Sequence, residues 1–275
     1  MPADQSGGPS PLGRPALLGA VSGMLSGLFG LGGGLVIVPG LLLVIGMGQR
    51  RAAATSLAAV VPISAAGLLG YSLAGEVDWL LGLILAGASI VGSLAGAALL
   101  SKIPERHATF ALALLLVLVA LRMLGSTTAA IERPDLDAAR ILGVVALGAI
   151  AGLISGLFGV GGGFIVVPAL VLFFSEPSTL AKGASLLAIL ISALVTTLSN
   201  ARRARVDWRV ASAVGSAGVA TSFVSSRIAV GLPEALANRL FAVLLVVVSA
   251  NLVLRQRRRP RPRSGRAGDR PGRPR

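Results

Sequence analysis

Two glycine clusters are the features of this sequence most suited to chemistry. Residues 30–34 read Gly-Leu-Gly-Gly-Gly and residues 159–163 read Gly-Val-Gly-Gly-Gly, each inside a long apolar run. Glycine costs a helix about 1 kcal/mol per residue and permits positive φ, so we expect two half-helices meeting at an unwound turn. The turn exposes backbone N–H groups, and the half-helix after it has a positive N-terminal end. Backbone amides arranged in this way bind anions.

Serine residues accompany both clusters. Ser26 and Ser155 precede them by about one helical turn, and Ser56 and Ser185 hold equivalent places in the next apolar run. Their hydroxyl groups would add donors to an anion site. The alternative is that the small residues only let helices pack closely. We predict that the substrate-binding residues are Ser26, Gly30, Gly32, Gly33, Gly34, Ser56, Ser155, Gly159, Gly161, Gly162, Gly163 and Ser185.

The composition indicates a membrane protein. Of 275 residues, 54% are hydrophobic and 13% charged, and the mean hydropathy is +0.84. About one quarter of a soluble domain is charged, and a helix needs about 20 apolar residues to cross a bilayer. We therefore expect an all-α polytopic membrane protein of the cell membrane. Its apolar runs are 14–46, 52–73, 79–100, 108–124, 140–174, 183–199, 208–229 and 238–254.

The chain contains an internal duplication. Residues 23–39 and 152–168 are identical at 11 of 17 positions, at an offset of 129. Both segments end in a proline, Pro39 or Pro168, which we expect to act as a structural hinge. The duplication predicts two homologous halves of four apolar runs each, with the first run of each half broken at glycine. The expected divisions are a disordered arm 1–13, transmembrane repeat 14–124, linker 125–139, transmembrane repeat 140–254 and an Arg/Pro-rich disordered tail 255–275.

Basic residues predict how the halves are oriented. Short basic loops stay in the cytoplasm, and the more basic loop of each matched pair alternates between the halves: 47–54 over 176–183, 201–208 over 72–79, and 101–107 over 230–236. Equivalent loops then lie on opposite faces, which requires an odd number of crossings per half. A broken run that enters and leaves on the same side satisfies this requirement, so we predict inverted halves. Whether the broken runs span or re-enter is left open.

The net charge of +14 resides mostly in the tail. Residues 255–275 hold ten arginines and one acid, Asp269, and the other 254 residues have a net charge of only +5. A tail of this composition cannot form a packed core. We expect it to be cytoplasmic and close to anionic headgroups of the bilayer, with no nucleic acid bound, because interleaved aromatic residues are lacking.

Several functions are disfavoured by what the sequence lacks. It has no G-x-x-x-x-G-K-[ST] loop for ATP, no cysteine, and one histidine, His107, so we expect no metal and no cofactor. The apolar runs contain no pair of groups for acid–base catalysis, and we expect that the protein is not an enzyme. Asp78 and Asp207 precede tryptophans and are expected to start helices at the membrane interface, with a proton or substrate relay as the alternative.

Two arginines near the ends of apolar runs allow two interpretations. Arg122 and Arg227 are expected to reach the membrane interface with their charged ends, and contact with an anionic substrate is the alternative.

The duplicated motif G-x-x-S-G-x-x-G-x-G-G-G-x-x-x-V-P resembles that of the TauE/SafE membrane transporters, also called 4-toluene sulfonate uptake permeases. The resemblance covers residues 16–254. It implies a membrane transporter of a small sulfur-containing anion such as sulfite, a sulfonate or sulfoacetate. It identifies neither the anion nor the direction of transport, and the coupling ion and oligomeric state also stay open.

We therefore predict a secondary transporter of a small anion that works by alternating access between its two repeats. A passive anion channel would use the same turns, but its flux would not saturate. A non-transporting membrane scaffold held by its arginine tail is the other alternative. Small anionic substrate and lipid bilayer are the expected partners.

Overall fold

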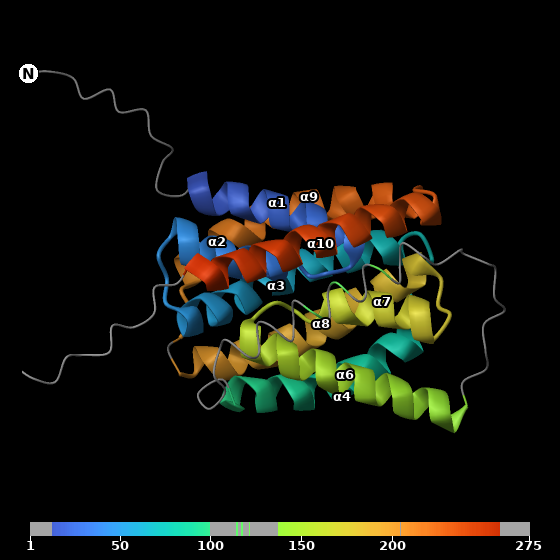
Figure 1. Cartoon of the computed structure of the whole chain (residues 1–275). Helices are drawn as coiled ribbons and strands as arrows, with labels where there is room; N and C mark the ends of the chain where they lie inside the picture. The colour runs from blue at the N-terminus through green and yellow to red at the C-terminus, as the bar shows by residue number, and fades with distance from the viewer. Residues whose placement is uncertain are drawn as a thin grey trace, which may run out of the picture.

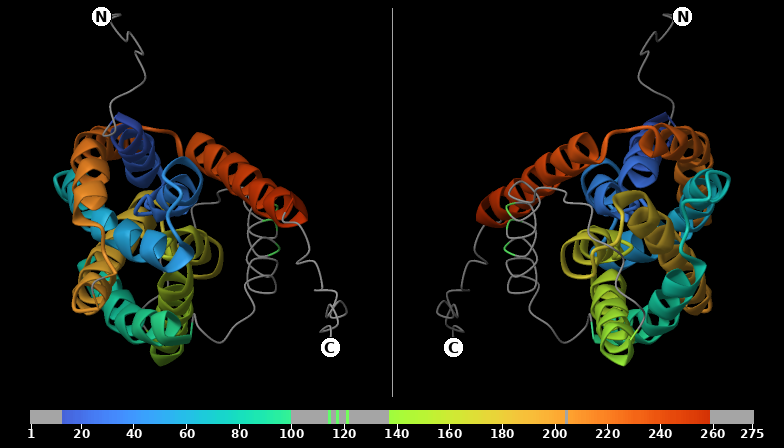
Figure 2. Two further views of the ribbon diagram at one scale, coloured as in Figure 1. Left: turned by 90° about the vertical axis from the view of Figure 1, so that its left-hand side faces the viewer. Right: turned by 90° about the vertical axis from the view of Figure 1, so that its right-hand side faces the viewer.

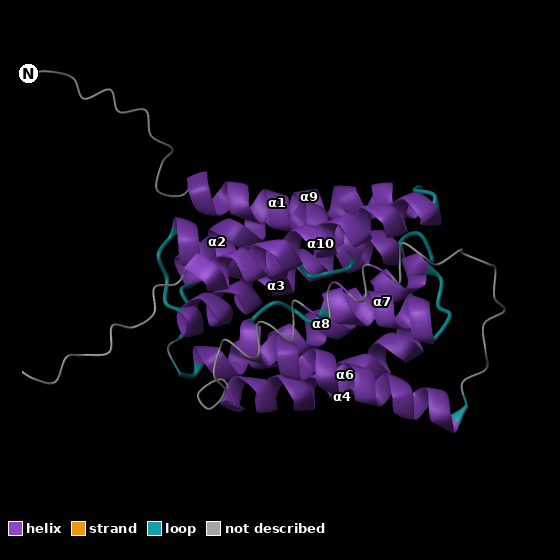
Figure 3. Cartoon of the chain, in the orientation of Figure 1, coloured by secondary structure: helices purple, strands orange, loops and turns teal. Residues whose placement is uncertain are grey.

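The computed structural model describes residues 13–99, 137–203 and 205–258, with the single positions 114, 117 and 121. All regular structure in this part of the chain is helical, in agreement with the predicted all-α class (Figures 1 and 3). The helices are α1 Gly13–Phe29, α2 Gly34–Val44, α3 Gln49–Ser72, α4 Trp79–Leu99, α6 Ala138–Phe158, α7 Gly163–Phe173, α8 Ser178–Ala201, α9 Trp208–Val230 and α10 Glu234–Arg258.

Some predictions concern residues outside the described part. They are those for the arm before residue 13, most of the run 108–124, linker residues 125–136, tail residues 259–275, His107 and Arg122.

The predicted interruption of two apolar runs is confirmed. The run 14–46 forms α1 and α2 with a break between Phe29 and Gly34, and the run 140–174 forms α6 and α7 with a break between Phe158 and Gly163. Both breaks coincide with the glycine clusters. Neither 11-residue helix after a break, α2 or α7, is long enough to cross a bilayer alone.

Five helices of the described part are long and apolar enough to cross a membrane: α3, α4 up to Gly96, α6, α8 and α9. The most buried are α3 and α8, with 78% and 67% of their most apolar windows inside the protein. The other three are 39–44% buried. Helices α3 and α8 therefore form the centre of the bundle, and the others face outward over much of their surface.

The packing of the helices interleaves the two halves of the chain. Helix α1 of the first half packs along α9 of the second, and α6 of the second half packs along α4 of the first. Glycines permit these close approaches: a Cβ atom at Gly23 would be 2.2 Å from the carbonyl oxygen of Gly218, and one at Gly152 would be 2.3 Å from that of Ser89. Neither half forms its core alone.

The two broken runs enter the bundle from opposite ends. In Figure 1, α1 begins and α2 ends at the left, whereas α6 begins and α7 ends at the right. The breaks themselves lie between these ends, inside the bundle (Figure 3). The helices therefore bring two short backbone turns into the interior from opposite directions.

Several helix boundaries differ from the predicted runs, most of all at α8 and α10. Helix α8 begins at Ser178, five residues before the predicted run 183–199, and α10 extends four residues past Leu254 to Arg258. The extra residues of α10 are arginine and glutamine, which favour helices as strongly as many apolar residues do. At its other end α10 lies at the edge of the bundle (Figure 2), where Phe241 stacks on Phe29 with ring centroids 5.3 Å apart.

Candidate functional site

The interruption of each run is a left-handed backbone turn. Three glycines of each turn have φ between 70° and 93°, a region that residues with a Cβ atom rarely adopt. The three positions correspond exactly at the offset of 129: Gly30, Gly32 and Gly33 in the first turn, and Gly159, Gly161 and Gly162 in the second.

The two turns are in direct backbone contact. A Cβ atom at Gly34 would be 2.5 Å from the carbonyl oxygen of Val160, and one at Gly163 would be 2.4 Å from that of Gly30. Only glycine therefore fits at these two positions without separating the turns. The structure thus brings together all eight glycines predicted for the site.

A serine from each half holds the turn of the other half. Ser56 of α3 donates a hydrogen bond of 3.0 Å to the carbonyl oxygen of Gly159. Ser185 of α8 donates one of 2.9 Å to the carbonyl oxygen of Gly30. Both hydroxyl groups are buried. Each one fixes the position of a turn by donating to one of its carbonyl groups.

The other two predicted serines lie in the last turns of α1 and α6, just before the glycine turns. The carbonyl oxygens of Ser26 and Ser155 accept hydrogen bonds from the amides of Gly30 and Gly159, which close the last turns of α1 and α6. The side chain of Ser26 is 0% exposed, and its Oγ has no hydrogen-bond partner in the described part of the chain. This hydroxyl group is a buried donor beside the first turn.

Backbone amides of both turns lack acceptors. No described atom accepts a hydrogen bond from the amides of residues 31–35 or 160–164, all of which are buried. The amides that follow are satisfied, because Gly33 and Gly162 accept from them. Unpaired buried N–H groups are rare, and each costs about 1–3 kcal/mol. A concentration of them in two touching turns is suited to binding an anion.

A buried lysine distinguishes the first turn from the second. Lys182 is 1% exposed, and a Cβ atom at Gly30 would be 2.9 Å from the Lys182 Cβ. At the equivalent place beside Gly159 lies Ala53. The basic-residue pattern predicts a loop over residues 176–183, whereas Lys182 belongs to the first turns of α8. The one sequence feature that could have indicated this position is that Lys182 stands directly before the apolar run 183–199.

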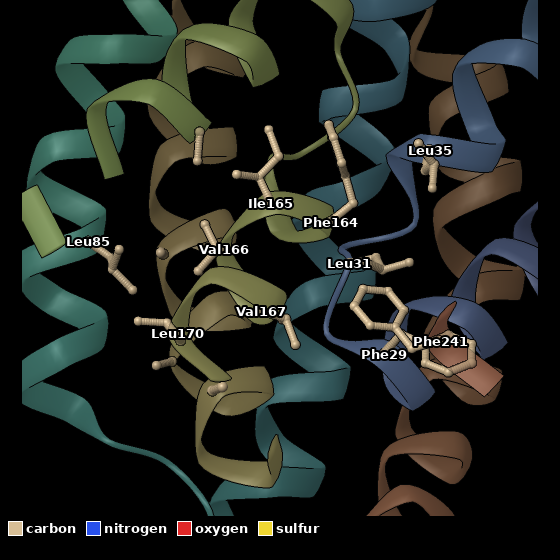
Figure 4. Packing of buried hydrophobic residues seen from close by; sticks show 14 of the residues in the cluster. Phe29, Leu31, Leu35, Leu85, Phe164, Ile165, Val166, Val167, Leu170 and Phe241 are labelled. Carbon is tan, nitrogen blue, oxygen red and sulfur yellow. The ribbon is translucent and has the colours of Figure 1, made fainter. Parts of the chain in front are cut away.

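Apolar side chains surround the paired turns. Figure 4 shows Leu31 of the first turn and Phe164 at the start of α7 within one buried cluster that also includes Phe29 and Phe241. The predicted hinges Pro39 and Pro168 lie inside α2 and α7, at the sixth position of each. Proline has no N–H group, so each of these short helices lacks one internal hydrogen bond.

Both aspartates begin helices, as predicted. Asp78 Oδ1 accepts a 2.9 Å hydrogen bond from the amide of Leu81, and Asp207 Oδ1 accepts one of 3.3 Å from that of Val210. The charged group of Arg227 donates to the carbonyl oxygen of Gly70, 3.3 Å away.

An ion pair lies toward each end of the bundle. Arg51 pairs with Asp207 at 2.8 Å, with side chains 62% and 21% exposed. Arg140 pairs with Glu176 at 2.5 Å, with side chains only 8% and 3% exposed. The sequence does not reveal the buried pair, because its partners are 36 residues apart and meet only through the fold.

The fold and site define a multi-pass membrane protein with two broken helices whose turns meet inside the bundle. The chain matches the family described as sulfite exporter TauE/SafE over residues 2–123 and 144–274, and it belongs to that family of membrane transporters. This confirms the resemblance inferred from the duplicated motif.

Curated relatives support the same assignment. A "Probable membrane transporter protein" of Xylella fastidiosa (strain 9a5c) is 31% identical over 242 residues, covering 86% of this chain and 93% of the relative. The "Probable membrane transporter protein YunE" of Bacillus subtilis (strain 168) is 28% identical over 221 residues, covering 72% and 81%. No solved structure matches this chain.

Proposed function

We propose that this protein is a secondary transporter of a small sulfur-containing anion, such as sulfite, a sulfonate or sulfoacetate. The observation that carries the proposal is the pair of touching turns with buried amides that have no acceptor. The family supports transport across a membrane, and its description names sulfite.

The anion binds where the turns meet. Helices α2 and α7 begin there. The dipole of each helix places about half a positive charge at its N-terminus, next to the free amides. An anion with three oxygen atoms has enough acceptors for several N–H groups at once. The Ser26 hydroxyl group and the charge of Lys182 favour an anion further at the first turn. The binding residues are those predicted from the sequence, with Ser56 and Ser185 acting through the carbonyl groups that they hold.

The two halves form an inverted repeat that exposes the site to each side in turn. Three observations support this proposal: the offset of 129 in the sequence, the entry of the broken runs from opposite ends, and the exchange of packing partners between the halves. Exchange of the conformations of the two halves would then open the site to the opposite side of the membrane, which is what alternating access requires.

The end of the bundle that holds the α2–α3 and α8–α9 connections faces the cytoplasm. The Arg51–Asp207 pair joins these two connections, and Arg50, Arg202 and Arg203 lie close by in sequence. α10 also ends at this side in Figure 1, which directs the arginine tail into the cytoplasm.

Anion flux into proteoliposomes tests the proposal. In the Gly34→Ala variant the new Cβ atom would displace the Val160 carbonyl group, and we expect flux to fall about tenfold or more. Gly87→Ala is the matched control, because nothing lies within 4 Å of a Cβ atom there. Equal flux in both folded variants would remove the turns from the mechanism. Flux that rises linearly without saturation would favour the channel.

A further inference from the structure

One side chain touches both turns. Ile189 of α8 is 2% exposed, and a Cβ atom at Gly32 would be 2.7 Å from its Cγ2. A Cβ atom at Gly163 would be 2.7 Å from its Cδ1, and one at Gly161 would be 3.6 Å from its Cγ2. The two branches of this isoleucine therefore reach the first and second turns together.

The equivalent residue of the first half has a shorter side chain and makes fewer contacts with the turns. Val60 of α3 precedes Ile189 by 129 positions and is 0% exposed. Its Cγ1 would be 3.3 Å from a Cβ atom at Gly32, and none of its atoms lies within 4 Å of a Cβ atom at Gly161 in the second turn. Valine lacks the Cδ1 atom by which Ile189 reaches Gly163. The structure thus shows the contact with both turns for Ile189 of α8.

Ile189 lies on the same face of α8 as a residue that holds the first turn. Ser185, which holds the Gly30 carbonyl group, is four residues earlier on α8 and therefore on the same face. One helix face thus places first a hydroxyl group and then a stiff apolar group against the turns. β-Branched side chains keep one χ1 rotamer in helices, so Ile189 forms a rigid wall.

We propose that Ile189 is the specificity-determining residue of the anion site: it limits the size of the group attached to the sulfur atom. The inference rests on the proposed function, because it takes the junction of the turns as the binding place. We expect the Ile189 side chain to admit small anions such as sulfite and methanesulfonate and to exclude an aryl sulfonate. One methylene in an apolar pocket changes discrimination by about 10-fold or more.

The first experiment measures the ratio of benzenesulfonate flux to methanesulfonate flux in proteoliposomes. We expect Ile189→Ala to raise this ratio about tenfold and Val60→Ala to change it less than about twofold. Ile189→Val removes only the atom that reaches Gly163 and gives an intermediate ratio if the alanine variant does not fold. An unchanged ratio in the folded Ile189 variants would overturn the proposal.

The second experiment needs no flux. The chain contains no cysteine, so Ile189→Cys would carry its only thiol. We expect an anionic methanethiosulfonate reagent to label it, with slower labelling in methanesulfonate, whereas Ile63→Cys stays unlabelled. Ile63 is 0% exposed and packs against Gly218 instead of the turns. Equal resistance of both thiols would overturn the role of Ile189. Labelling with protection, but no flux of any anion, would contradict transport and leave the binding site standing.

Discussion

Ser56 donates a hydrogen bond of 3.0 Å to the carbonyl oxygen of Gly159, a residue 103 positions further along the chain. The same relation holds between Ser185 and Gly30, at 2.9 Å. Each half of the protein thus holds the turn of the other half. If one half moves against the other, these two hydrogen bonds must either be kept or break. The geometry of the turns therefore depends on how the two halves are arranged.

Removal of the Ser56 hydroxyl group should destabilise the protein. Ser56→Ala leaves the buried Gly159 carbonyl group without this donor, and we expect a loss of about 1–3 kcal/mol in the free energy of unfolding. Thermal unfolding in detergent measures it. Ser212→Ala is the control, because that serine is exposed and bonds only to its own helix. A loss no larger than that of the control would show that the Ser56 bond adds no stability.

Neutralising Lys182 should weaken anion binding. Lys182→Gln removes the charge of a buried side chain whose Cβ lies beside the first turn, and we expect the anion concentration for half-maximal flux to rise about tenfold. The exposed Arg209 provides the comparison, because Arg209→Gln changes the net charge equally but far from the turns. The charge of Lys182 has no part in binding if both variants keep the wild-type half-maximal concentration.

The two ion pairs should differ in their energetic importance. Glu176→Ala leaves the Arg140 charge buried, and we expect a loss of about 3–5 kcal/mol in unfolding free energy. Arg51→Ala breaks a pair whose arginine is exposed, and it should cost about 1 kcal/mol or less. Thermal unfolding of both variants at low and high salt compares them. The opposite order of effects would contradict this assignment.

Labelling of single cysteines tests the orientation. We expect Arg50→Cys and Arg203→Cys to react from the cytoplasmic face and Ala74→Cys from the opposite face. Arg50 and Arg203 flank connections joined by the Arg51–Asp207 pair, so they must share a face. Impermeant maleimide applied to right-side-out and inside-out vesicles measures this. Reaction of the Arg50 and Ala74 variants from one common face would refute the inverted arrangement.

Local conformational preferences allowed several features of this protein to be predicted from its sequence. The glycine clusters predicted the two breaks, because consecutive glycines weaken a helix wherever it lies. Asp78 and Asp207 predicted helix starts for an equally local reason, since a carboxylate accepts from amides in the next turn. Apolar length alone indicated the membrane, and the duplicated motif indicated the family.

Tertiary structure decided which of these elements meet. Only the fold places Ser56 on the turn of the other half, Lys182 beside Gly30, and Ile189 against both turns. These contacts join residues far apart in the chain, and a Cβ–carbonyl approach of 2.5 Å depends on how helices cross. Spacing along one chain records which residues share a helix face. The pairing of faces is determined by close packing of the whole bundle.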